Sequence, residues 1–91
     1  MYVPNTLDGA KVILYTDNKA SNNFGYVRYE DHDEFITALA IAKYDKDKNY
    51  YLFDCNLGWE VIGDTLHSTI DEAKFYAENS IKVGEITWNE I

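Results

Sequence analysis

Hydrophobic and β-branched residues recur in short runs along the first third of the chain, and turn-forming residues separate these runs. The runs 11–16 (KVILYT) and 24–30 (FGYVRYE) are rich in β-branched and aromatic residues, which is typical of strands. Between them, 17–23 holds Asp, Ser and three Asn, which favour turns. The pattern predicts an irregular lead-in over 1–10 and then two strands joined by a loop.

The segment 34–44 fits two patterns. Its three alanines and a candidate N-cap at Asp33 favour a helix. Its alternation favours a strand, with Ile36 and the alanines on one side and four larger residues on the other, namely Phe35, Thr37, Leu39 and Ile41. We interpret the segment as a strand because one register connects it to the two strands that follow.

That register depends on two loops. Asn56-Leu57-Gly58 predicts a three-residue hairpin loop with Gly58 at positive φ, and 45–49 predicts a five-residue loop. The expected pairs are then Tyr44–Tyr50, Ile41–Phe53, Tyr51–Gly63, Phe53–Val61 and Cys55–Trp59. The large side chains Leu39, Ile41, Phe53 and Val61 would share one face, with Trp59 beside them.

A helix is predicted after this hairpin. Ser68 and Asp71 have the spacing of a capping pair, and Asp71 and Glu72 suit the positive end of a helix dipole. An apolar stripe follows at helical spacing, made by Ile70, Ala73, Ala77 and Ser80 or Ile81, with Tyr76 on its flank. Gly84 lies beyond the helix end, and 85–88 could return as a short last strand beside the sheet.

The elements together predict one α+β domain over 1–91, a mostly antiparallel meander with one helix from the C-terminal half packed on one face. The other face would hold Ile36, the alanines, Tyr50, Leu52 and Ile62, with Asp54 opposite Glu60. Such a face is too apolar to be wholly solvated. Either the N-terminal segment or a second helix covers it, or a protein partner or a second copy of the chain does.

Charge narrows the classes of function. The 91 residues carry 16 acidic and 8 basic side chains, for a formal net charge of −8. Binding to nucleic acid needs clustered Lys and Arg, and Arg28 is the only arginine, so direct nucleic-acid binding is not expected.

The cysteine count and the lack of long apolar runs exclude further classes of protein. A single cysteine, Cys55, allows no internal disulfide, and its apolar neighbours predict a buried, inert thiol. The chain shows no pattern of a signal peptide and no apolar run of membrane-spanning length, so we expect a soluble cytoplasmic protein without membrane contact.

Candidate chemistry is sparse. The segment 45–49 has the first ligands of a calcium loop, but Tyr50 and Asn56 stand where Gly and Glu are required, so it is a turn. His67 precedes the helix cap, where a structural role is expected. No nucleophile motif and no phosphate-binding glycine loop occur. The sequence therefore predicts no enzyme, no cofactor and no metal site.

Acidic and aromatic side chains remain as candidate binding residues. Residues 30–34 hold four carboxylates around His32, which suits a solvated loop or an electrostatic docking patch. Phe75 lies off the apolar stripe of its helix and is a candidate exposed anchor beside acids. The predicted partner-binding residues are Glu30, Asp31, Asp33, Glu34, Asp54, Glu60, Asp71, Glu72, Phe75 and Glu78.

The segment 50–78, with its Trp-containing hairpin, its Asp-Thr-Leu-His turn and its helix, followed by Ile86-Thr-Trp88, resembles small acidic immunity proteins of bacterial toxin–immunity systems. The resemblance covers the C-terminal half and leaves 1–33 outside it. It implies a stoichiometric inhibitor of a toxin, often a nuclease. It transfers no binding residue, because immunity surfaces diverge with their toxins.

These observations predict a non-catalytic protein that neutralises a basic protein partner through an acidic and aromatic surface. A highly acidic protein associates quickly with a basic partner, and nucleases are basic because they bind phosphates. The alternatives are a phage-encoded inhibitor that mimics DNA, a small metal-binding or catalytic domain using His32 and His67, and a structural homodimer.

Overall fold

The computed structural model describes residues 2–81 and 85–91, and most of its regular structure is β-strand. The helical part consists of α1 (Ile70–Tyr76), which continues as one π-helical turn over Ala77–Ile81. The strands are β1 (Thr6–Leu7), β2 (Ala10–Tyr15), β3 (Tyr26–Arg28), β4 (Asp33–Phe35), β5 (Ala38–Lys43), β6 (Tyr50–Cys55), β7 (Val61–His67) and β8 (Asn89–Glu90). The predicted α+β class, mostly antiparallel with one helix, is confirmed.

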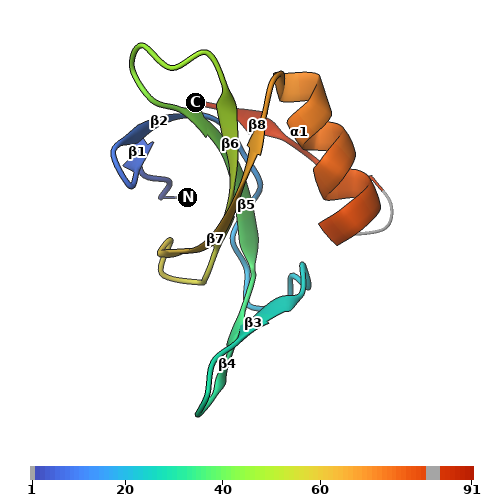
Figure 1. The fold of residues 1–91 in the computed structure, drawn as a ribbon. Coiled ribbons are helices and arrows are strands. Elements are labelled where there is room, and N and C mark those ends of the chain that lie inside the picture. Colours follow the sequence, from blue (N-terminus) through green and yellow to red (C-terminus); the bar gives the residue numbers. More distant parts are fainter. Residues whose placement is uncertain (1, 82–84) are drawn as a thin grey trace.

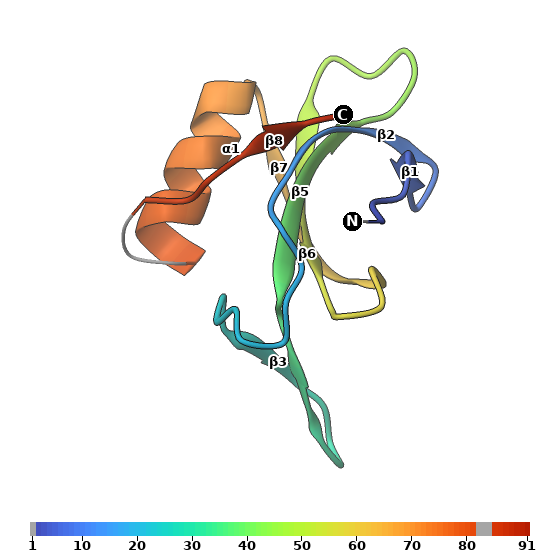
Figure 2. The same cartoon turned by 180° about the vertical axis from the view of Figure 1, so that it is seen from behind.

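The main sheet has the order β1-β2-β5-β6-β7, and β8 also pairs with β2. All its pairs are antiparallel, and the sheet curls into a half-barrel with α1 on one side (Figures 1 and 2). Strands β3 and β4 form a separate hairpin that projects from one end of the half-barrel. The predicted strand 34–44 is thus a strand over Ala38–Lys43, while Phe35 belongs to the separate hairpin.

The predicted register of β5 and β6 is wrong by one residue. Ala40, not Ile41, lies opposite Phe53, and Ile41 lies opposite Leu52. The connecting loop, 44–49, is one residue longer than predicted because Lys46 takes a positive φ of 70° and the Asp47 N–H donates to the Tyr44 carbonyl. A one-residue slip moves every side chain of a strand to the other face.

The register of β6 and β7 also differs from the prediction. Cys55 pairs with Val61, a bulge follows, and Asp54 lies opposite Gly63. The Asn56 side chain accepts hydrogen bonds from the Gly58 and Glu60 N–H groups and so closes a five-residue loop. Within that loop Trp59, rather than Gly58, takes the positive φ.

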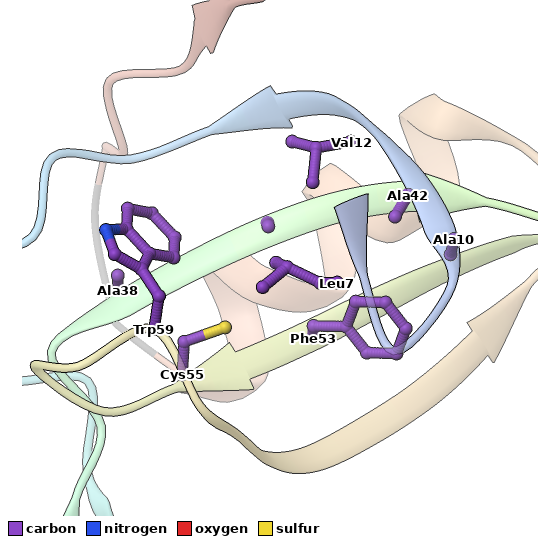
Figure 3. Close-up of a cluster of buried hydrophobic side chains, with 9 residues drawn as sticks. Leu7, Ala10, Val12, Ala38, Ala42, Phe53, Cys55 and Trp59 are labelled. Atoms are coloured by element: carbon purple, nitrogen blue, oxygen red, sulfur yellow. The ribbon is translucent and has the colours of Figure 1, made fainter. Parts of the chain in front are cut away.

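The corrected register sorts the core by size. The alanines of β5 face Phe53, Cys55 and Trp59, as Figure 3 shows. Leu39, Ile41 and Leu52 face the helix instead, where they pack with Ala73 and Ala77. Because the alanines are small, they leave room on the concave face for the rings of Phe53 and Trp59. Both faces of β5 are therefore closely packed.

The N-terminal segment covers the concave face. Leu7 is buried there, and Val3 packs against the same cluster. Trp59 Nε1 donates to the Tyr2 carbonyl at 3.2 Å, which ties the segment to the β6–β7 loop. The N-terminal segment is thus one of the predicted covers, but the face it covers differs from the predicted one: the alanines lie on it, whereas Ile36, Tyr50, Leu52 and Ile62 pack on the helix side.

Helix α1 begins one residue later than predicted. Its N-cap is Thr69, whose hydroxyl accepts from the Glu72 N–H at 3.0 Å, while Ser68 donates to the Glu72 carboxylate. Both Ser68–Asp71 and Thr69–Glu72 have capping-box spacing. The second pair makes the bond from the Glu72 N–H to the Thr69 hydroxyl, while the Glu72 carboxylate accepts from the N–H and hydroxyl of Ser68 rather than from Thr69. The buried stripe contains Ala73 and Ala77 as predicted.

The C-terminal strand lies beside the sheet but not where it is predicted. Residues 85–88 are irregular, and β8 pairs Asn89 with Tyr15 and Glu90 with Leu14. Gly84, expected after the helix, lies outside the described residues. No helix of the described ranges is long and apolar enough to cross a membrane.

Candidate functional site

The β3–β4 hairpin carries the densest set of exposed aromatic and acidic side chains. Tyr26 lies opposite Phe35 and Arg28 opposite Asp33, and the Tyr29 N–H donates to the His32 carbonyl at 2.8 Å to close the turn. The sequence Asp31-His32-Asp33 interrupts two β-rich runs, and the chain folds back at that interruption. The hairpin therefore presents its tip away from the core (Figure 1).

Three aromatic rings on this hairpin are open to solvent. Tyr26 is 51% exposed, Tyr29 43% and Phe35 65%. The Tyr26 and Phe35 rings meet edge to face with centroids 6.3 Å apart, and Tyr29 stacks on His32 at 5.1 Å. Exposed rings that support one another are pre-ordered for contact, which lowers the entropy lost on binding.

The carboxylates of the hairpin surround these rings. Glu30 and Asp31 are exposed, and Asp31 Oδ1 lies 2.7 Å from His32 Nδ1. Asp33 accepts from Arg28 Nε at 3.1 Å, and the guanidinium lies 5.3 Å from the centre of the Tyr26 ring. The four acids predicted as one patch are thus together, with one arginine fixed among them.

Asn56 connects this hairpin to the β6–β7 loop. Its Nδ2 donates to Glu34 Oε1 at 2.6 Å and to Glu60 Oε1 at 2.9 Å. Its backbone carbonyl accepts from the Asn18 side-chain amide at 3.0 Å, and the Asn18 side-chain oxygen accepts from the Thr37 hydroxyl. The side-chain amide of Asn56 therefore holds two carboxylates, and its backbone carbonyl binds Asn18, so this one residue fixes the base of the hairpin.

A groove of about 590 Å³ lies beside this junction. Phe35 and Leu57 supply its apolar part, and Glu34 and Asn22 supply polar groups. Leu57 is exposed. The hairpin and the loop tip therefore both line this groove, and apolar and acidic side chains contribute to it.

The acids of helix α1 form a second group. Asp71, Glu72 and Phe75 are exposed, Phe75 at 69%, and Glu78 is partly buried. Hydrogen bonds from Ser68 hold the pKa of Glu72 below its usual range. The predicted set of partner-binding residues therefore divides between the hairpin with Glu60 and the outer side of the helix.

Asp54 is unlike the other predicted binding residues. It lies in the main sheet, where its Oδ1 is buried and has no hydrogen-bond partner among the described residues. Gly63 opposite leaves room for it, since a Cβ there would lie 2.8 Å from Asp54 Oδ2. Burial, with a smaller contribution from the charge of Asp64, raises the pKa of Asp54 to about 6.

We expect Asp54→Asn to raise the free energy of unfolding by about 1–2 kcal/mol at pH 7.5. A pKa of about 6 against 3.8 in the unfolded chain means that the charged form destabilises the fold, by up to about 3 kcal/mol above pH 6. The cost disappears as pH falls from 6 towards 4, because the folded state takes up a proton first. The gain is smaller than the full cost because the buried amide also lacks a partner.

Urea denaturation of both proteins at pH 7.5 and pH 4.5 measures this difference. Asp45→Asn, at an exposed turn position, is the matched control and should change stability equally little at both values. An equal gain from Asp54→Asn at both pH values would contradict a buried, charged Asp54.

Other titratable residues have structural contacts. His67 is buried, with Nε2 2.8 Å from the Thr65 hydroxyl and its ring against Tyr76. Burial raises the pKa of the Cys55 thiol to about 12, so it is protonated at neutral pH. Within residues 2–81 and 85–91, no three His, Cys, Asp or Glu side chains are grouped to hold a metal ion.

Sequence reasoning missed the residues that organise the surface. The sequence pattern predicts only a turn at Asn56 and places Phe35 on a sheet face. The signal for the hairpin was the polar Asp31-His32-Asp33 between two β-rich runs. No local signal identifies the bond between Asn56 and Glu34, because Glu34 lies 22 residues away on β4.

Comparison of the chain with protein-family models, curated proteins and solved structures finds no match.

Proposed function

We propose that this chain is a non-catalytic binding protein that docks a basic protein partner through the β3–β4 hairpin and its adjoining groove. The resemblance of the C-terminal half to immunity proteins makes a bacterial toxin, such as a nuclease domain in the cytoplasm, the favoured partner. The observation that carries the proposal is the projecting hairpin itself, which carries three exposed rings and the exposed carboxylates of Glu30, Asp31 and Asp33.

The energetics of this surface suit protein recognition. Tyrosine and other large rings dominate binding hot spots, and burying them yields most of the affinity. The acids around the rings would accelerate encounter with a basic partner and set the specificity. On a nuclease, carboxylates would occupy positions that bind phosphates, which blocks the substrate without catalysis.

The stiffness of the hairpin also supports the proposal. The Arg28–Asp33 ion pair links its two strands, and the Tyr29 ring stacks on His32 at its turn. The side-chain amide of Asn56 binds Glu34 at its base. A pre-ordered surface loses less conformational entropy on docking than a free loop does.

The structure gives no support to the homodimer alternative. It required an uncovered apolar face on the sheet, and that face is buried under Leu7 and Trp59.

The proposal is tested with two matched double variants. Glu30→Lys with Phe35→Ser changes the hairpin, and Glu78→Lys with Phe75→Ser makes the same chemical change on the helix. Partners are captured from lysate of the native host, eluted with a salt gradient and identified by mass spectrometry, and the recovered partner is then produced for titration. We expect a basic protein whose affinity falls at least about tenfold for the hairpin variant and stays constant for the helix variant, with both melting temperatures unchanged.

The inhibitory role has its own readout. Cells that express the recovered partner should stop growing, and co-expression of the wild-type chain but not of the hairpin variant should restore growth. A partner that is a nucleic-acid-binding defence complex favours the phage-inhibitor alternative. Equal affinities of the hairpin variant and the wild type would contradict docking through the hairpin.

A further inference from the structure

A groove of opposite chemistry lies between the main sheet and helix α1. It has a volume of about 850 Å³, and its lining residues include three lysines, Lys11 on β2, Lys43 on β5 and Lys74 on α1. Ile13 and Ile70 contribute apolar surface to the same groove. In a chain with 16 acidic and 8 basic residues, three cations around one groove are an unusual concentration.

The placement of these lysines is unfavourable without a counter-charge. Lys11 and Lys43 are direct cross-strand partners, and like charges in that position destabilise a sheet. Lys43 and Lys74 are also partly buried, which removes part of the water that would screen them.

Among the described residues, these lysines have no direct ion-pair partner. Asp45 and Glu90 line the groove, yet none of the three lysines has an acidic group within 4.0 Å anywhere in 2–81 and 85–91. By contrast, Lys19 and Arg28 each pair with a nearby aspartate. Three unpaired cations around an apolar surface therefore form a site that is complementary to an anion with a hydrophobic body.

We propose that this groove binds a small organic anion that joins a carboxylate to an aliphatic body. The carboxylate would lie between Lys11 and Lys43, with Lys74 approaching from the helix, and the aliphatic body would cover Ile13 and Ile70. Charge-assisted hydrogen bonds to ammonium groups are the strong polar contacts that such a ligand needs. The volume lies in the range of ordinary small-molecule pockets.

The test uses three probes of related shape. Decanoate combines charge and chain, acetate keeps the charge alone, and decylammonium keeps the chain with the opposite charge. Titration calorimetry with the wild-type protein should detect decanoate, with binding of acetate and decylammonium at least about tenfold weaker. Decanoate should also raise the melting temperature, because it binds only the folded chain.

Variants locate the site. Lys43→Met and Lys74→Met should each weaken decanoate about tenfold, while Lys48→Met, at an exposed turn position, should leave it unchanged. Removal of Lys43 relieves a like-charge pair, so that variant should melt no lower than the wild type.

Three results would overturn the proposal. Decylammonium binding as tightly as decanoate would mean that the groove is merely apolar. Decanoate affinity that survives both lysine substitutions would place the ligand elsewhere. Sedimentation as a dimer that Lys43→Met dissociates, without any decanoate binding, would make the groove an interface between copies.

Discussion

Phe53→Ala is expected to lower the free energy of unfolding by about 3–5 kcal/mol. The ring is almost wholly buried on the concave face of the sheet, where it stacks on Tyr51 with centroids 5.6 Å apart. Its removal leaves a cavity under the N-terminal segment that the paired strands cannot collapse to fill. Urea denaturation measures the loss, and Phe75→Ala, on the solvent side of the helix, should cost less than about 0.5 kcal/mol.

The same site tests the register of β5 and β6. Ala40 lies directly opposite Phe53, so Ala40→Leu should overpack the concave face and cost about 1–3 kcal/mol alone. Combined with Phe53→Ala, the leucine should occupy the cavity, and the double variant should be more stable than Phe53→Ala. Strict additivity would place the two side chains on opposite faces, which is the register predicted from the sequence.

The elements of the fold follow from the sequence better than their registers do. The strand interpretation of 34–44 is confirmed over Ala38–Lys43, although the register that decided it against a helix is wrong. The apolar stripe around Ala73 identifies the helix. The register depends instead on how many residues each loop uses. The positive φ of Lys46 and Trp59 lengthens both loops, and neither residue type favours that conformation.

The candidate site is likewise predictable from the sequence only in part. The acidity of 30–34 is visible in the sequence, and the structure gathers those residues on one hairpin. Exposure of Phe35 could not be predicted, because it depends on the chain leaving the main sheet at Ile36 and Thr37. The burial of Asp54 follows from its pairing with Gly63, which only the correct register reveals.

Asn56 joins the stability of the fold to the geometry of the proposed docking surface. Its amide is the donor that keeps the Glu34 and Glu60 carboxylates together, and its carbonyl oxygen closes the loop that carries Trp59. Trp59 in turn covers the concave core and bonds the N-terminal segment. A change at this residue should therefore affect both the core and the hairpin.

Asn56→Asp is expected to lower the free energy of unfolding by about 3–5 kcal/mol at pH 7.5 although it preserves the shape of the side chain. The new carboxylate cannot donate, so two hydrogen bonds to carboxylates are lost, and a third negative charge stands at the positions where Glu34 and Glu60 now accept from the amide. Asn56→Ala removes these two bonds and also the two that Asn56 Oδ1 accepts from the Gly58 and Glu60 N–H groups, but it adds no charge, so it should cost less, about 2–3 kcal/mol.

Denaturation at two pH values separates charge from shape. The repulsion holds the pKa of the new carboxyl above its usual range, so the folded state binds a proton before the unfolded chain does as pH falls. The difference in the free energy of unfolding between Asn56→Asp and Asn56→Ala should therefore be smaller at pH 4.5 than at pH 7.5. Asn49→Asp, in the β5–β6 turn, is the matched control and should show no such narrowing. If the aspartate and alanine variants were equally stable at pH 7.5, the amide would not be holding two charged carboxylates.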